Sequence, residues 1–110
     1  MTITDGLTLA GHVGVDSGQI MIGDPCYIED WDTNQNDEWN LEGKEGDYSY
    51  HGASATTLAH NFGTLGMHSA VIMSSGYGDG LYPVYVKTND DGRVVMAIID
   101  FNDELDKDEE

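Results

Sequence analysis

Two short stretches of the sequence place carboxylates and phenol rings beside glycine-rich turns. They are GVDSGQIMIGDPCYI at residues 14–28 and GYGDGLYPVY at residues 76–85. The side chains with binding chemistry in them are Asp16, Asp24, Tyr27, Tyr77, Asp79, Tyr82 and Tyr85. Backbone N–H groups at such turns bind anions, carboxylates bind hydroxyls, amines or cations, and tyrosine rings stack on flat rings. We therefore predict that these residues line one ligand-binding pocket. The alternative is that Asp and Gly only shape β-turns and that Tyr only fills strands.

Two of the four basic residues flank a predicted hairpin turn. Lys87 and Arg93 lie on either side of Asn-Asp-Asp-Gly at residues 89–92. Cations placed together hold a phosphate or a carboxylate through charge-assisted hydrogen bonds. We predict that Lys87 and Arg93 contribute to the same ligand site; the alternative is that they balance the charges of Asp90 and Asp91.

The single cysteine and the four histidines raise the question of catalytic or metal chemistry. Cys26 is a candidate nucleophile with His12 or His60 as its base, but cysteine is among the most often buried residues, which favours a structural role. The histidines, at positions 12, 51, 60 and 68, lack the spacing typical of metal sites. Residues 30–37 alternate oxygen donors as a calcium loop does, but Gln35 stands where such a loop needs glycine. No cofactor is expected, and the spacing defines no set of metal ligands.

The elements that must position these residues are mostly strands. The sequence predicts five of them, at residues 7–15, 19–28, 67–75, 81–88 and 93–101. Gly, Asp and Asn turns bound them, and Asp24-Pro25 ends the second apolar run, because proline cannot donate to a central ladder. The last strand is apolar on both faces, which is typical of a central strand covered on both sides. Pro83 predicts that its own strand is an edge or is bulged there.

These patterns predict a mostly β fold, as a small antiparallel β-sandwich or partly open barrel with at most one short helix. Residues 1–101 are expected to form a single β domain, and residues 102–110 an acidic, disordered tail. Residues 48–51 are predicted as a short strand, whereas residues 55–62 fit either a short helix or a strand. Because a β fold this small often pairs through an edge strand, the sequence is compatible with a homodimer or a higher homo-oligomer.

The charge of the chain restricts its partners. The 21 acidic and 4 basic residues give a formal net charge of −17, which disfavours direct binding to nucleic acid and to anionic membranes. It suits a cation binder or a ligand for a basic partner. No run approaches the ~18 apolar residues of a membrane span, and the N-terminus does not read as a signal peptide. A single cysteine allows no intrachain disulfide, which suits the cytoplasm as the expected location; a secreted protein without disulfides is the alternative.

Four motifs carry a resemblance. They are VDSG, GDPCY, GYGDGLYPVY and DGR…DF, in this order, and they lie in the outer parts of the chain rather than in residues 30–66. Through them the sequence resembles a family of small proteins of unknown function that occur in bacteria and in phage genomes. The resemblance brings no activity, substrate or catalytic residue. It implies a phage-encoded protein in the host cytosol, where small acidic phage proteins often act on the host.

Three classes of function follow from these observations. The favoured one is a non-enzymatic binding protein that sequesters a small, anionic, nucleotide-derived host defence signal. Its tyrosines would stack on the base, while backbone amides with Lys87 and Arg93 would meet the phosphates. The first alternative is an acidic inhibitor of a basic host protein that imitates nucleic acid. The second is a metal-dependent hydrolase that uses Asp16, Asp24 or Asp79, although no spacing singles out a catalytic pair.

Overall fold

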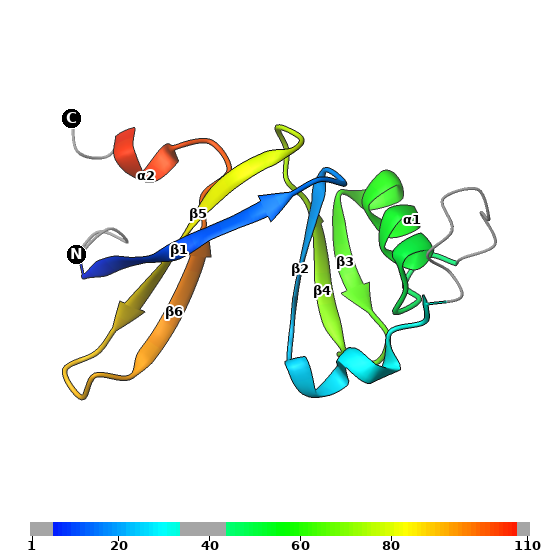
Figure 1. Ribbon diagram of the computed structural model, residues 1–110, viewed down its shortest axis with the longest axis horizontal. Helices are drawn as coiled ribbons and strands as arrows, with labels where there is room; N and C mark the ends of the chain where they lie inside the picture. Colours follow the sequence, from blue (N-terminus) through cyan, green and yellow to red (C-terminus); the bar gives the residue numbers. More distant parts are fainter. Residues whose placement is uncertain (1–5, 34–43, 108–110) are drawn as a thin grey trace.

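The computed structural model describes residues 6–33 and 44–107 of the 110-residue chain. It contains two three-stranded antiparallel sheets, which confirms the predicted mostly antiparallel β fold. Sheet A has the strand order β1-β5-β6, and sheet B has the order β2-β4-β3. The strands are β1 (Leu7–Val15), β2 (Gln19–Gly23), β3 (Phe62–Leu65), β4 (Ala70–Ser74), β5 (Gly80–Thr88) and β6 (Val94–Ile99) (Figure 1). The described strands do not close into a barrel.

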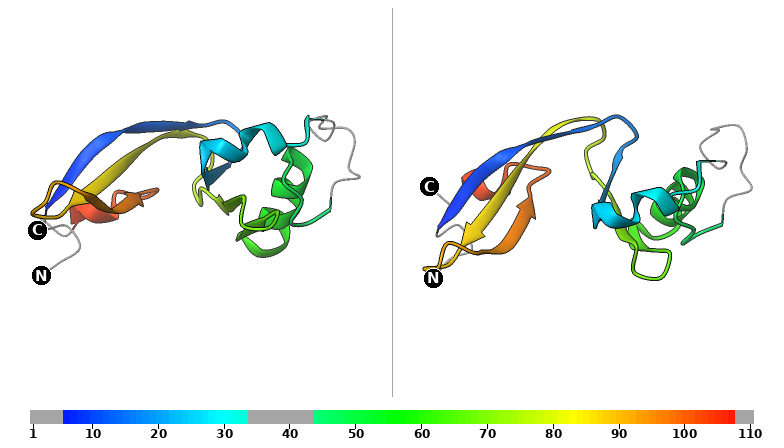
Figure 2. Two further views of the ribbon diagram at one scale, coloured as in Figure 1. Left: turned by 90° about the horizontal axis from the view of Figure 1, so that it is seen from below. Right: turned by 60° about the horizontal axis from the view of Figure 1, so that its bottom comes forward.

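Two connections join sheet A to sheet B. Residues 16–18 lead from β1 to β2, and residues 75–79 lead from β4 to β5. Because β1 pairs with β5 and β2 pairs with β4, both glycine-rich turns pass from one sheet to the other instead of closing hairpins. The sheets therefore lie at the two ends of an elongated molecule with extents of 46 × 29 × 20 Å (Figure 2). The turn at residues 89–92 does close a hairpin, between β5 and β6, as predicted.

The best-packed core lies in sheet B, beneath helix α1 (Tyr50–His60). Ala53 of the helix and Leu65, Ala70 and Ile72 of the strands are between 0% and 5% exposed. The partly buried rings of Trp31 and Tyr48 meet edge to face beside this cluster, with centroids 5.1 Å apart. Two layers, one of strands and one of helix, thus exclude water from the apolar side chains between them. Neither α1 nor α2 (Glu104–Lys107) is long and apolar enough to cross a bilayer.

Capping residues set the ends of α1. Ser49 Oγ accepts the N–H of Gly52 at 2.9 Å, which satisfies a backbone donor in the first turn. Asn61 ends the helix in the left-handed region, with φ of 71°. The short strand predicted at residues 48–51 is therefore wrong, because those residues form the cap and the first turn. Of the two alternatives for residues 55–62, the helix is correct as far as His60, and β3 then begins at Phe62.

Pro83 lies in β5, the central strand of sheet A, although proline predicted an edge or a bulge. Its residue partner on β1 is His12, and its carbonyl accepts the N–H of Asp100 at 3.2 Å. The last residue pair between β5 and β6 is Val84 with Ile99. The N–H that proline lacks would face the carbonyl of Asp100, just after the last residue of β6, so the ladder ends at this position. The predicted edge strand is wrong, because β5 lies between β1 and β6. A register shift does lie beside Pro83, between the pairs Leu9 with Tyr85 and Gly11 with Val84.

Strand β6 forms an edge of sheet A, whereas its pattern predicts a covered central strand. Val94, Val95 and Met96 are 62%, 57% and 42% exposed. Within the chain, β6 has β5 on one side and no strand among the described residues on the other. An apolar strand is thus left with an unpaired backbone edge.

The chain beyond β6 folds back in an ordered turn that leads into α2. Asp100 is buried, at 7% exposure, and its carboxylate accepts the backbone N–H groups of Asn102, Glu104 and Leu105. Leu105 is also buried, at 8% exposure. Within the segment predicted to be a disordered tail, the structure places the backbone N–H groups of residues 102, 104 and 105 on this carboxylate, and residues 104–107 form α2. Residues 108–110 lie outside the described part of the chain.

Candidate functional site

The two glycine-rich turns meet where the sheets join. The N–H of Gly18 donates to Asp79 Oδ1 at 2.9 Å across 61 residues of sequence, and the N–H of Ser75 donates to Gly18 O at 3.0 Å. Positive φ values at Gly18, Gly76 and Gly78, of 69°, 78° and 87°, allow the sharp bends that this approach needs. We call residues 16–18 and 75–79 the junction. Four of the predicted site residues lie at or beside the junction, namely Asp16, Tyr77, Asp79 and Tyr82.

Several polar groups of the junction are occupied by the fold itself. The Tyr82 hydroxyl donates to Gly78 O at 2.8 Å, and the Ser75 hydroxyl donates to the same oxygen at 2.6 Å. The Tyr82 ring packs edge to face on Phe101, with centroids 5.1 Å apart. For Asp79 and Tyr82 these contacts describe a structural role. Tyr77 is 68% exposed and is open to a partner or ligand.

Replacing Asp79 with alanine should loosen the junction. Loss of one hydrogen bond worth about 1 kcal/mol predicts roughly fivefold faster hydrogen exchange at the Gly18 amide, measured by NMR. Asp16→Ala is the matched control, because it removes a carboxylate from the other segment of the junction, residues 16–18. The rate of hydrogen exchange at the Gly18 amide should be the same in this variant as in the parent. Equal exchange rates in the parent and in Asp79→Ala would contradict this role of the carboxylate.

The other predicted residues lie away from the junction. Asp24 and Tyr27 follow the far end of β2, at the other end of sheet B. Tyr85 and Lys87 lie farther along β5, and Arg93 precedes β6. The nine predicted residues are therefore distributed over three regions of the described chain.

The two cations do not face each other directly across the hairpin. Residue pairing sets Lys87 opposite Met96. The N–H of Arg93 donates to Asn89 Oδ1 at 3.1 Å, so the backbone of Arg93 is part of the turn. Lys87 and Arg93 are therefore not opposite each other in the hairpin, and a phosphate bound by both side chains would have to reach between two different residue pairs.

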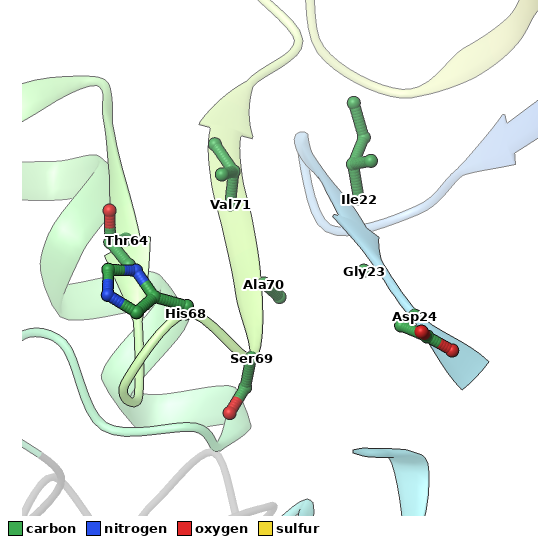
Figure 3. Close-up of a pocket in the computed structure, with 8 residues that line it drawn as sticks. All are labelled: Ile22, Gly23, Asp24, Thr64, His68, Ser69, Ala70 and Val71. Atoms are coloured by element: carbon green, nitrogen blue, oxygen red, sulfur yellow. The ribbon is translucent and has the colours of Figure 1, made fainter. Parts of the chain in front are cut away.

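A pocket of about 200 Å³ opens beside Asp24 on sheet B. Its apolar wall includes Ile22, Ala70 and Val71, and its polar groups are those of Asp24, Thr64, His68 and Ser69. Figure 3 shows Ile22 and Val71 on neighbouring strands, with Asp24 at the end of β2 and His68 beside Thr64. Carboxylate, imidazole and hydroxyl groups thus border an apolar surface, a combination that small-molecule sites use, although the hollow is smaller than the ~300–1,000 Å³ of a typical ligand pocket.

Two features of sheet B form this pocket: the register of its strands, and the close approach of the β2 backbone to the backbone of Ser69. Val71 of β4 pairs with Ile22 of β2 on one side and with Thr64 of β3 on the other. A Cβ atom at Gly23 would lie 2.8 Å from Ser69 O, so only glycine lets β2 pass this closely. Asp24 follows at once, and its position at the end of the strand brings a carboxylate to the rim.

The carboxylate of Asp24 also caps the 3₁₀ helix η1 (Pro25–Asp30). Its Oδ1 accepts the N–H of Cys26 at 2.9 Å. This bond fixes the orientation of the side chain, and Pro25 in the first turn has no N–H to satisfy. A second hollow, of about 280 Å³, shares Asp24 and Gly23 and is otherwise lined by Met21, Pro25, Ile28 and Tyr48. Asp24 therefore borders two neighbouring hollows.

A protein-family model described as "Protein of unknown function (DUF4241)" matches residues 11–99. The chain belongs to the DUF4241 family. The matched region runs from the middle of β1 to the end of β6, so it includes sheet B, the junction, the pocket and all of sheet A except the first half of β1 in this DUF4241 chain. Searches of curated proteins and of solved structures found no match.

Cys26 of the DUF4241 chain is exposed rather than buried as its residue type predicted. Desolvation, the hydrogen bond with Asp24 and the negative charges of Asp24 and Asp30 raise the pKa of the thiol. A raised pKa leaves the thiol protonated at neutral pH, which is the unreactive form. Of the proposed bases, His12 lies on β1 in sheet A, and His60 Nε2 lies 2.6 Å from Glu45 Oε1. The geometry gives no support to a cysteine nucleophile.

The histidines of the DUF4241 chain are dispersed. His12 lies on β1, His51 is buried in α1, His60 pairs with Glu45, and His68 lies at the pocket. Among residues 6–33 and 44–107, no three His, Cys, Asp or Glu side chains gather as metal ligands would. The calcium-like loop at residues 30–37 falls partly outside the described residues, from residue 34 onward.

Sequence reasoning found Asp24 but missed the other polar groups of the pocket. Thr64, His68 and Ser69 lie in β3 and in the turn before β4. None of them adjoins an Asp-Gly motif, and only the pairing of β2 and β3 with β4 brings them to Asp24. The φ of 71° at His68 marks this turn in the structure, but the sequence carries no matching signal.

Proposed function

We propose that this DUF4241 protein is a non-enzymatic binding protein for a small nucleotide-like ligand, and that the pocket beside Asp24 receives the ligand's ring and hydroxyl groups. The observation that supports this proposal is the set of polar side chains around one apolar patch of sheet B. A flat ring would lie on Ile22 and Val71. Ligand hydroxyls would donate to the Asp24 carboxylate, as sugar hydroxyls do in dinucleotide-binding proteins.

Charge limits which part of the ligand enters the pocket. Asp24 repels a phosphate, and the cations predicted to bind phosphate, Lys87 and Arg93, belong to sheet A. We therefore assign the pocket to the uncharged part of the ligand, with phosphates directed to solvent. Screening beyond ~8 Å at physiological salt reduces their repulsion by the remaining acidic residues.

The sequence motifs suggest the biological class of this ligand. VDSG, GDPCY and GYGDGLYPVY resemble proteins of bacteria and phage genomes. We propose that the chain is of phage type and that it sequesters a nucleotide-derived host defence signal in the host cytosol. Such a role needs tight, stoichiometric binding and no turnover.

Calorimetry with adenosine, AMP, ADP-ribose and a cyclic dinucleotide tests the proposed site. We expect at least one of them to bind, and Asp24→Asn to weaken its binding at least tenfold, because a charged hydrogen-bond acceptor is lost. Asparagine is also a good N-cap, so η1 should remain folded.

Asp16→Asn is the matched control, since it removes one carboxylate charge at the junction instead of at the pocket. Its affinity should equal that of the parent. Absence of binding for all four compounds at 1 mM, or parental affinity of Asp24→Asn, would refute the site.

One property of the chain favours a second candidate function. The net charge of −17 suits an acidic inhibitor of a basic host protein. Binding to such a partner would weaken steeply with added salt and would not respond to Asp24→Asn alone. Ligand binding in the pocket should change little over the same range of salt for an uncharged probe such as adenosine.

A further inference from the structure

Strand β6, which has no neighbouring strand on its outer side among the described residues, has a sequence typical of a strand paired on both sides. Residues Val94–Ile99 read VVMAII, with apolar side chains on both faces and no charge, proline or glycine. Exposed edge strands in monomeric proteins usually carry lysine, proline or a bulge that prevents pairing with another chain. The one register shift of β6 lies at its start, opposite Lys87 and Thr88, and the rest of the strand is regular.

The direction of the backbone groups identifies which residues form this edge. The N–H of Asp100 points to Pro83 of β5. Backbone N–H and C=O groups alternate in direction along a strand. The backbone groups of Ile98 therefore also point to β5, whereas those of Ala97 and Ile99 point away from β5, to the outer edge of the sheet. Ala97 is exposed and lies near the middle of the outward-facing edge.

We infer that β6 pairs with β6 of a second copy of this chain, antiparallel and about a two-fold axis near Ala97. Sheet A and its copy would then form one six-stranded sheet with the order β1-β5-β6-β6-β5-β1. Each β6 would become a central strand, as its apolar pattern on both faces predicts. The contact is isologous, because the same residues serve on both sides.

The elongated molecule exposes more surface than a compact chain of the same mass. The accessible surface of the chain is 7641 Å², whereas a compact monomer of 12.0 kDa exposes roughly 6,000 Å². A standard interface would bury ~800 Å² of each copy, which is about half of this excess. The radius of gyration of 15.7 Å likewise exceeds the ~13 Å of a compact domain of this length.

Charge is compatible with this pairing despite the net charge of −17. The contact strand carries no charged residue. In an antiparallel pair centred near Ala97, Arg93 of one copy would lie beside Asp100 and Phe101 of the other, where the chain is acidic. One of the few cations would thus meet an acidic segment at each end of the interface.

Sedimentation equilibrium with the full chain at about 50 µM tests the inference. We expect the parent to have twice the 12.0 kDa mass of one chain. Ala97→Pro should be monomeric, because it removes an outward N–H while leaving the bonds to β5 in place. Ala97→Val keeps the N–H and the strand propensity and should remain a dimer. A monomeric parent, or an Ala97→Pro dimer, would overturn the proposal.

Disulfide trapping tests the strand register. In a Cys26→Ser background, Ala97→Cys should form a cross-linked dimer under mild oxidation, because the two copies of residue 97 face each other. Asp90→Cys, in the exposed hairpin turn, should remain uncross-linked. A dimer that links at residue 90 and not at residue 97 would contradict pairing through β6.

Discussion

Replacing Gly52 with alanine should lower the free energy of unfolding by about 3 kcal/mol and the melting temperature by roughly 10–20 °C. A Cβ atom at this position would overlap the carbonyl oxygen of Asp47 and lie 2.7 Å from its carbonyl carbon. Both are backbone atoms, so no side-chain rotation relieves the clash. Either the first turn of α1 or the turn at residues 46–49 must move, and both support the core of sheet B.

Urea unfolding followed by circular dichroism measures this loss. Gly11→Ala is the matched control, because nothing lies within 4 Å of a Cβ atom there. It should change the free energy of unfolding by no more than about 0.5 kcal/mol. If Gly52→Ala unfolds at the same urea concentration as Gly11→Ala, the protein has room for a Cβ atom at residue 52, which would contradict the close contact between Gly52 and Asp47.

Asp100→Ala should lower the free energy of unfolding by about 2–3 kcal/mol. Its carboxylate accepts three backbone N–H groups, at 3.1, 3.0 and 2.8 Å. Without it these donors lose their acceptor at a position that is only 7% exposed. The turn that places Leu105 against the protein should then open. Thermal unfolding and hydrogen exchange at the Leu105 amide both report this change.

Asp100→Asn separates charge from geometry. The amide oxygen can still accept two of the N–H groups, but the NH₂ group would face the third donor, so we expect an intermediate loss of stability. Asp90→Ala, which removes an exposed carboxylate from the hairpin turn, should change stability by less than about 0.5 kcal/mol. An Asp100→Ala variant as stable as Asp90→Ala would show that the network does not hold the C-terminal turn.

Strand positions could be predicted from the sequence because they depend on local pattern. Alternating and β-branched residues identify β1, β5 and β6, and Asn89 to Gly92 identify the hairpin between the last two. The sheet to which each strand belongs could not be predicted. The turn at residues 16–18 is short enough for a hairpin, and only the long-range pairings of β1 with β5 and β2 with β4 exclude it.

Helix α1 was ambiguous for a physical reason. Its interior contains Gly52, Thr56 and Thr57, which are weak helix formers. The helix depends instead on the Ser49 cap and on packing against β3 and β4. The candidate site shows the same division between local and long-range information. Turn chemistry found Asp24, whereas His68 reaches the same pocket only through the register of sheet B.

The junction has a mechanical consequence for the molecule. Sheet A and sheet B are tied by two backbone segments, residues 16–18 and 75–79, which are themselves linked through Gly18. A single linker would permit torsion in any direction, but two parallel tethers resist torsion and leave bending as the softer motion. A load applied to β6 would therefore reach the pocket on sheet B as a change in the angle between the sheets.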